Sequence, residues 1–217
     1  MPVTTVIFDM DGLLIDSEPY WEEAGKETLA QFNVRLTPEQ YHITTGLRTS
    51  EWINHWFHHF NISQTHAAAA EAVIVKKAID KIALKGTVMP GVDHIFNYCI
   101  KRQFKIGLAS SSPMGLIDVV VDKLQIRPYL HTITSAEQLP FGKPHPQVFI
   151  NCAAALQADP QSCLVFEDSF NGMIAAKAAK MKCVVVPHPA SFNHPRWGAA
   201  DLKLSSLANF NDLLLNF

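Results

Sequence analysis

The stretch VIFDMDGLLIDSEP, residues 6–19, decides the fold of this chain. Its apolar start leads into Asp9, and a second acid, Asp11, follows two residues later, just before Gly12. A short apolar run of this kind predicts a buried strand of a parallel sheet, with both acids at its carboxyl end. Two carboxylates this close repel each other in a partly dry pocket, and a divalent cation would remove the conflict. For the acids alone, a solvated turn is an equal alternative.

Further apolar runs rich in β-branched residues recur along the chain, with helical patterns between them. The predicted strands are 6–8, 104–109, 131–134, 163–166 and 183–186. The predicted helices between them are 91–103, 113–125, 146–157 and 169–181, and a weaker strand at 201–204 and a last helix at 206–215 follow. This alternation predicts an α/β fold with a doubly wound, mainly parallel sheet.

One segment, 17–86, interrupts this alternation because it contains no convincing strand. It contains a helix start at Thr37-Pro38-Glu39-Gln40, in which a threonine cap precedes a proline and a glutamine follows three residues after the cap. The simplest interpretation is a helical cap domain at 17–86, inserted into a catalytic core formed by 1–16 and 87–217.

Composition narrows the class of partner. The chain has 217 residues and a formal net charge of −2, with 18 basic and 20 acidic residues, so no strong field favours nucleic acid or an anionic membrane. No apolar stretch approaches the roughly 20 residues that span a bilayer. The four cysteines form no CxxC pair, which argues against a zinc site or a disulfide framework. We expect a cytoplasmic monomer that acts on a small molecule.

Three further motifs follow predicted strands. Serines 110–112 precede a proline, which is compatible with an anion site at a helix start but, taken alone, more typical of ordinary capping. Lys143 stands in GKPHP and could neutralise a phosphate, although a single loop lysine is usually solvated. Glu167 and Asp168 form a second acidic pair, which a cation shared with Asp9 would need. Their common position at strand ends makes coincidence a poor explanation.

These motifs together resemble the haloacid dehalogenase-like phosphohydrolases, in nearly the whole chain. The four motifs that carry the resemblance are DMDG, Ser110 after GLA, Lys143 in GKPHP, and Glu167-Asp168 in FEDSFNG. The stretches LLIDSEP, GLASSSPM and EDSFNGMIAAKAAKM resemble the bacterial members that hydrolyse hexitol phosphates and 2-deoxyglucose 6-phosphate. The resemblance implies a Mg²⁺-dependent sugar phosphatase with a helical cap.

The resemblance also implies a role for each motif residue. Asp9 would attack phosphorus and form an aspartyl-phosphate, and Asp11 would act as general acid and then as general base. Mg²⁺ would be held by the Asp9 carboxylate, the Asp11 backbone carbonyl and Asp168, with Glu167 in the inner or outer shell. The phosphoryl oxygens would be held by Ser110, the Ser111 N–H and Lys143.

The cap residues and the alternatives are less constrained. The candidates to face the leaving group are Glu18, Trp21, Gly46, Leu47 and Arg48, and for each of them a packing or solvated role is the competing interpretation.

Asp11 disfavours a dehalogenase, since halide departure needs no proton. A phosphomutase of the β-phosphoglucomutase type stays open, although the mutase's hinge histidine is replaced here by Trp21. A sugar-phosphate sensor without turnover also stays open, whereas a receiver domain would be about half as long and uncapped.

Overall fold

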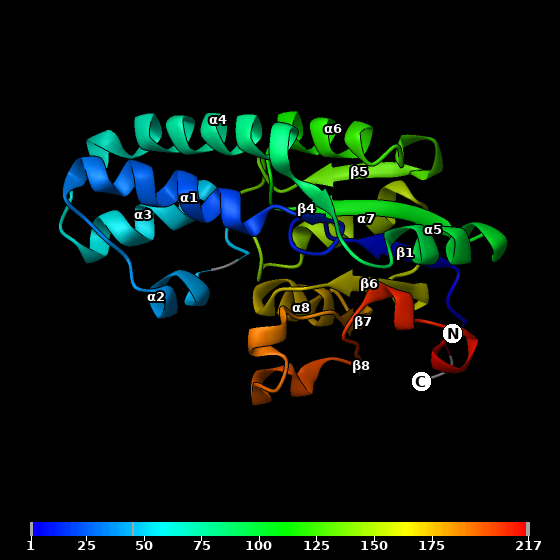
Figure 1. Cartoon of the computed structure of the whole chain (residues 1–217). Coiled ribbons are helices and arrows are strands. Elements are labelled where there is room, and N and C mark those ends of the chain that lie inside the picture. Colours follow the sequence, from blue (N-terminus) through cyan, green and yellow to red (C-terminus); the bar gives the residue numbers. More distant parts are fainter. Residues whose placement is uncertain (1, 45, 216–217) are drawn as a thin grey trace.

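The computed structural model describes residues 2–44 and 46–215, and a six-stranded parallel sheet lies at its centre (Figure 1). The strand order is β5-β4-β1-β6-β7-β8, and each neighbouring pair runs parallel. The strands are β1 (Thr5–Phe8), β4 (Lys105–Ser110), β5 (Thr132–Ser135), β6 (Cys163–Glu167), β7 (Lys182–Val185) and β8 (Leu202–Lys203). The prediction of a doubly wound α/β sheet is confirmed.

The central strands are buried on both faces of the sheet. In β1, Val6 and Phe8 pack into one apolar cluster, whereas Ile7 packs into the cluster on the opposite face. The first cluster includes α5 (Val92–Lys101) and α6 (Met114–Lys123), and the second includes α7 (Gln147–Ala155) and α8 (Phe170–Ala178). Burial on both faces explains why the strands are continuous apolar runs instead of alternating patterns.

A helical segment follows the first strand. It contains α1 (Glu18–Leu29), α2 (Pro38–Ile43), α3 (Thr49–His59) and α4 (Ala67–Lys85), and it extends to one side of the sheet in Figure 1. Two short antiparallel strands, β2 (Ile15–Asp16) and β3 (Thr87–Val88), pair at its two ends. Helix α2 begins with the predicted capping box, since Thr37 accepts from the Gln40 N–H at 3.2 Å and Gln40 accepts from the Thr37 N–H at 2.9 Å.

The C-terminal region differs from the prediction of a helix at 206–215. It forms two 3₁₀ turns instead, η7 (Leu207–Asn209) and η8 (Asp212–Leu214). The side chain of Ser206 accepts from the Ala208 N–H at 3.2 Å, and the side chain of Asn211 accepts from the Leu213 N–H at 3.0 Å. These local hydrogen bonds compete with a continuous helix.

Shorter features complete the fold. The strand predicted at 201–204 is present as the two-residue β8, and β2 and β3 were not predicted because two residues are too short to show a periodic pattern. Other 3₁₀ turns are η1 (Ala30–Phe32), η2 (Gln64–His66), η3 (Arg127–Tyr129), η4 (Pro160–Ser162), η5 (Pro189–Ser191) and η6 (Pro195–Ala199). All four cysteines are buried. Within 2–44 and 46–215, no helix combines the length and the apolar character needed to cross a bilayer.

Candidate active site

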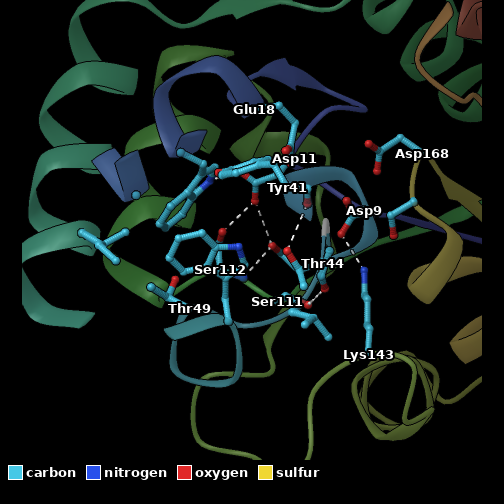
Figure 2. Close-up of a pocket in the computed structure, with 18 residues that line it drawn as sticks. Asp9, Asp11, Glu18, Tyr41, Thr44, Thr49, Ser111, Ser112, Lys143 and Asp168 are labelled. Carbon is cyan, nitrogen blue, oxygen red and sulfur yellow. Dashed lines mark hydrogen bonds and ion pairs between the residues drawn. The ribbon is translucent and has the colours of Figure 1, made fainter. Parts of the chain in front are cut away.

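A pocket lies between the carboxyl edge of the sheet and the helical segment (Figure 2). Asp9 directly follows β1, and its N–H still donates to the Phe166 carbonyl of β6 at 3.0 Å. Ser110 is the last residue of β4, and Asp168 directly follows β6. Because parallel strands have their carboxyl ends at one edge, these residues come together although they are far apart in the sequence.

Lys143 connects two acids in the floor of this pocket. Its ammonium group donates to Asp9 Oδ1 at 2.6 Å, to Glu167 Oε1 at 2.6 Å and to the Ala109 carbonyl at 3.1 Å. The lysine side chain is 1% exposed. Burial lowers the pKa of Lys143, but the adjacent Asp9 and Glu167 outweigh that effect and raise it above its usual range. Lys143 is therefore a fixed positive charge beside Asp9.

Glu167 and Asp168 are adjacent in the sequence but differ in their surroundings. The second carboxylate oxygen of Glu167 accepts from the Asp168 N–H at 3.0 Å, from the Ser169 N–H at 2.9 Å and from Ser169 Oγ at 3.0 Å. With Lys143 on the first oxygen, both oxygens of this fully buried carboxylate are occupied. Asp168, by contrast, lines the pocket. Glu167 thus anchors Lys143 and the start of α8, whereas Asp168 presents its carboxylate to the pocket.

Three carboxylates at this edge could hold a metal ion. One oxygen each from Asp9, Glu167 and Asp168 lies within 4.8 Å of the others. Burial raises the pKa of Asp9 to about 8, against the opposing effect of Lys143 and with a further contribution from Glu167. Burial, reinforced by Glu167 and Asp9, also raises the pKa of Asp168 well above its usual range. Three carboxylates with only Lys143 to balance their charge are suitable oxygen ligands for a hard divalent cation such as Mg²⁺.

Gly12 allows Asp168 to approach the loop that carries Asp9 and Asp11. Its φ of +72° lies in the left-handed region, which favours glycine. A Cβ atom at this position would lie 2.3 Å from Asp168 Oδ2. Any larger residue would therefore displace the acid that lines the pocket.

Asp11 is held by hydrogen bonds from both the sheet and the helical segment. Its Oδ1 accepts from Ser17 Oγ at 2.7 Å and from Trp21 Nε1 at 2.9 Å. Its Oδ2 accepts from Ser112 Oγ at 2.7 Å (Figure 2), and Ser110 Oγ lies 3.4 Å away. The carboxyl group is thus fixed at the pocket wall, in a position from which it could give or take a proton.

Several predicted residues line the pocket in the expected region. Glu18 does so from α1, and burial, with Asp11 and Asp9 nearby, raises its pKa to about 8. Ser110 and Ser111 line it from the end of β4, and Ser111 Oγ also donates to the Gly46 carbonyl at 3.2 Å.

Two further candidates, Trp21 and Arg48, form hydrogen bonds that the sequence did not predict. Trp21 lines the pocket, but its polar group donates to Asp11. Arg48 was predicted to face the leaving group, yet it does not line this pocket. Its Nη1 donates to the Ala136 carbonyl at 3.1 Å, and its Nη2 donates to Glu51 at 2.7 Å. The backbone carbonyls of a core loop occupy its guanidinium group, and the contact of Arg48 with the leaving group stays a prediction.

Other pocket residues were not predicted from the sequence. Tyr41, Thr44, Thr49, Trp52 and Ile74 line the region of the pocket that the helical segment forms. They come from three different helices and their connections, and their spacing in the sequence shows no common pattern. Ser112 was also missed as a partner of Asp11, since serines before a proline usually cap a helix.

Comparisons with known proteins agree with this fold. A family model described as haloacid dehalogenase-like hydrolase matches residues 3–180. Hexitol phosphatase B of Escherichia coli K12 is 39% identical over 215 residues, which cover 98% of this chain and 97% of that protein.

Two solved structures are similar in fold. One is β-phosphoglucomutase from Clostridium difficile, with a TM-score of 0.87 and 22% identity over 98% of this chain and 95% of that chain. The other is CbbY from Rhodobacter sphaeroides in complex with phosphate, with a TM-score of 0.86 and 22% identity over 98% of both chains. At this level of identity, the likeness applies to the fold alone.

Proposed function

Since the chain belongs to the haloacid dehalogenase-like hydrolases, we propose that it is a Mg²⁺-dependent phosphatase acting on hexose and hexitol monophosphates. The observation that carries this proposal is the contact of Lys143 with Asp9 at 2.6 Å beside Asp11 and Asp168. The 39% identity to hexitol phosphatase B supports the sugar phosphate as the substrate class. 2-Deoxyglucose 6-phosphate belongs to the same class of substrates.

The proposed division of the chain assigns a separate task to each domain. The catalytic core is 1–16 and 87–217, and it carries Asp9, Lys143 and Asp168. The cap domain is 17–86, and it closes the pocket over the leaving group. Mg²⁺ would be held by the carboxylates of Asp9 and Asp168 and the backbone carbonyl of Asp11, with Glu167 behind them. When bound, the cation neutralises these acids and the phosphoryl oxygens.

In the first step, a carboxylate oxygen of Asp9 attacks phosphorus, and the bond from phosphorus to the sugar oxygen breaks. Asp11 donates a proton to the departing oxygen, so the sugar leaves as a neutral alcohol. Lys143, Ser110 and the Ser111 N–H bind the phosphoryl oxygens as their charge is redistributed. The products of this step are the free sugar and an aspartyl-phosphate at Asp9.

In the second step, water attacks the phosphorus of the aspartyl-phosphate. Asp11, now a carboxylate, takes a proton from this water, and the bond between Asp9 and phosphorus breaks. Inorganic phosphate leaves and both acids return to their starting state. Ser17, Trp21 and Ser112 keep Asp11 in place for both transfers, because each donates a hydrogen bond to it.

The charge of the pocket favours a neutral leaving group. Among the pocket-lining residues that the structure describes, Lys143 is the one cation, and it contacts Asp9. The helical segment contributes uncharged side chains together with Glu18, whose carboxyl oxygens can accept hydrogen bonds from sugar hydroxyls. A leaving group with its own phosphate or carboxylate would meet no countercharge there.

This distribution also disfavours the phosphomutase alternative. A mutase must hold a sugar bisphosphate in two orientations and therefore needs a second anion site. In the described lining of the pocket no second cation is present, and Arg48 is bound to backbone carbonyls elsewhere. Hydrolysis is thus the better supported reaction.

The experiment that tests the proposal is a phosphate-release assay with Mg²⁺ on hexose and hexitol monophosphates, a sugar bisphosphate and phosphoglycolate. We expect the neutral-sugar monophosphates to be the best substrates and free sugar to be the product. Asp9→Asn is expected to lower kcat by about three powers of ten or more, because it removes the nucleophile.

Asp16→Asn is the matched control, since Asp16 lies in the same stretch but is exposed. It is expected to retain the parental rate. Equal rates of Asp9→Asn and the parent would contradict the nucleophile assignment. Isomerised sugar phosphate in place of free phosphate would favour the mutase. The cytoplasmic location and the monomeric state expected from the sequence stay predictions.

A further inference from the structure

Arg48 and Glu51 lie at the start of α3 in the helical segment, yet their polar groups contact a loop of the core. Arg48 Nη1 donates to the Ala136 carbonyl at 3.1 Å and to the Leu139 carbonyl at 2.5 Å. Its Nη2 donates to the Pro140 carbonyl at 3.2 Å. One guanidinium group thus binds three carbonyls of the loop 136–142, which runs from β5 towards α7.

Glu51 adds a contact at the far end of the same loop. Its Oε1 accepts from Arg48 Nη2 at 2.7 Å and from the Gly142 N–H at 2.9 Å. Burial would raise the pKa of Glu51, but the hydrogen bonds from Arg48 and Gly142 outweigh it and hold the pKa below its usual range. The Arg48–Glu51 pair therefore holds the loop 136–142 at both ends.

Gly142 is packed directly against this pair. A Cβ atom on Gly142 would lie 2.6 Å from Glu51 Oε2 and 2.8 Å from Arg48 Cγ. The Arg48 side chain is only 11% exposed. The backbone at 142 can approach the pair this closely because glycine has no side chain.

The next residue in the chain is Lys143. Its ammonium group donates to Asp9 and Glu167. The other end of the side chain, at Cα, is positioned by the backbone that follows Gly142. The contacts from the helical segment thus end one residue before the cation of the proposed phosphoryl site. If the loop lost one of these hydrogen bonds and shifted, Lys143 would move relative to Asp9.

We propose that Arg48 and Glu51 are positioning residues that fix the loop 136–142, and through it Lys143, when the helical segment lies over the pocket. The proposal rests on the proposed phosphatase function. It makes closure of the cap and placement of Lys143 one event, because the same two side chains bridge the helical segment and the loop. The pair touches neither the sugar nor the phosphate.

The competing interpretation is that Arg48 binds the substrate directly, as expected from the sequence. Its geometry argues against this, because both terminal nitrogens are occupied by loop carbonyls and Glu51. The two interpretations differ in what they require of Glu51. If Arg48 binds the substrate directly, activity depends on Arg48 alone. If the pair positions the loop 136–142, activity depends on both Arg48 and Glu51.

The test is a double-mutant cycle with Arg48→Ala, Glu51→Ala and the double variant, measured with a hexitol phosphate. Each single change is expected to lower kcat about tenfold or more with little change in KM, because hydrogen bonds to charged groups are lost and Lys143 is displaced. The kcat of the double variant is expected to be no lower than that of the slower single variant, since each single change already breaks the Arg48–Glu51 pair that holds the loop. Glu51→Gln keeps an acceptor for Gly142 and should recover some of the lost rate.

Amide hydrogen exchange supplies a second readout that needs no substrate. Exchange of the Gly142 N–H is expected to be about tenfold faster or more in Glu51→Ala, because this N–H loses its acceptor. Lys77→Ala is the matched control, since Lys77 forms an ion pair with Glu27, and both residues lie inside the helical segment. It should change neither kcat nor this exchange rate.

Two results would overturn the proposal. One is additivity in the double variant: its loss in log kcat equals the sum of the two single losses, and only Arg48→Ala raises KM. The other is unchanged Gly142 exchange in Glu51→Ala. If no sugar phosphate were hydrolysed by the parent, the proposed function would fail, while the exchange experiment would still decide whether the pair holds the loop.

Discussion

Asp9 is a buried acid and Asp168 a partly buried one, and both have too little positive charge around them. Lys143 neutralises some of this charge, but it is shared between Asp9 and Glu167. Burial and the neighbouring acids therefore raise the pKa of Asp9 to about 8 and that of Asp168 well above its usual range. The residues of the site thus hold protons that a cation would displace.

A prediction at the residue scale concerns Mg²⁺ affinity and pH. Below pH 8 the Asp9 carboxyl is protonated without metal, and a cation must expel this proton to bind. The apparent affinity for Mg²⁺ should therefore rise with pH between pH 6 and 8, by about tenfold per pH unit for each proton that the cation displaces from Asp9 and Asp168. Titration calorimetry in buffers of different ionisation enthalpy would measure both the affinity and the released protons.

The Asp168→Asn variant is the control for this prediction. It removes one proposed ligand while changing the side-chain volume little, so we expect Mg²⁺ binding to weaken strongly at every pH. An affinity for Mg²⁺ that stays constant from pH 6 to 8 would count against proton displacement at Asp9.

At the scale of elements, the start of α8 connects the sheet to the site. Ser169 is the N-cap of this helix, and its Oγ accepts from the Gly172 N–H at 3.0 Å. The same hydroxyl donates to Glu167 Oε2 at 3.0 Å. One side chain therefore both caps the helix and satisfies the buried acid that holds Lys143.

We predict that Ser169→Ala destabilises the protein by about 2 kcal/mol, roughly 1 kcal/mol from the cap and the rest from the hydrogen bond to the carboxylate. At this chain length the melting temperature would fall by about 4–8 °C. Urea unfolding followed by circular dichroism would measure the loss.

Thr37→Ala is the comparison for the capping contribution alone. Thr37 caps α2 with an exposed capping box and touches no buried acid. We expect a loss of about 1 kcal/mol for this variant. Equal losses in the two variants would show that the hydrogen bond from Ser169 to Glu167 contributes no net stability.

At the scale of the whole molecule, the helical segment meets the sheet through its two ends and through its apolar side chains, in addition to the contacts of Arg48 and Glu51 with the loop 136–142. Its ends are joined by the antiparallel pair β2–β3, in which Asp16 lies opposite Thr87. Its apolar side chains, including Trp52 and Ile74, belong to the same cluster as Phe8 of the central strand. The short connection favours a separable cap, whereas the shared cluster favours a single cooperative unit.

The proposed domain division predicts that 17–86 can be replaced by a two-residue Asn-Gly turn, since the flanking strands are already paired as in a hairpin. The shortened chain should fold with a lower melting temperature, because some of the shared cluster is lost. It should hydrolyse p-nitrophenyl phosphate slowly and no longer distinguish one sugar phosphate from another. Calorimetry and a substrate panel would check both expectations.

The full-length chain measured under the same conditions is the reference. If the shortened chain stayed unfolded, with no cooperative thermal transition, the helical segment and the sheet would form one folding unit. The division at 16–17 and 86–87 would then be wrong.

The sequence by itself determined the sheet, the order of its helices and strands, and the residues that end its strands. Apolar runs and capping residues act over a few positions, so they can be identified locally. Parallel strands place all their carboxyl ends at one edge, so the meeting of Asp9, Lys143 and Asp168 followed from topology. The prediction of a last helix was wrong because the side chains of Ser206 and Asn211 compete for the backbone.

The tertiary structure alone decided which polar groups meet across the molecule. Glu167 and Asp168 are chemically similar neighbours, and only their surroundings show that one is saturated with hydrogen bonds while the other lines the pocket. Arg48 binds the loop 136–142 and Trp21 binds Asp11, although neither contact has a signal in the sequence. Such contacts depend on how the helical segment packs on the core, and that packing is set by the whole chain rather than by any local pattern.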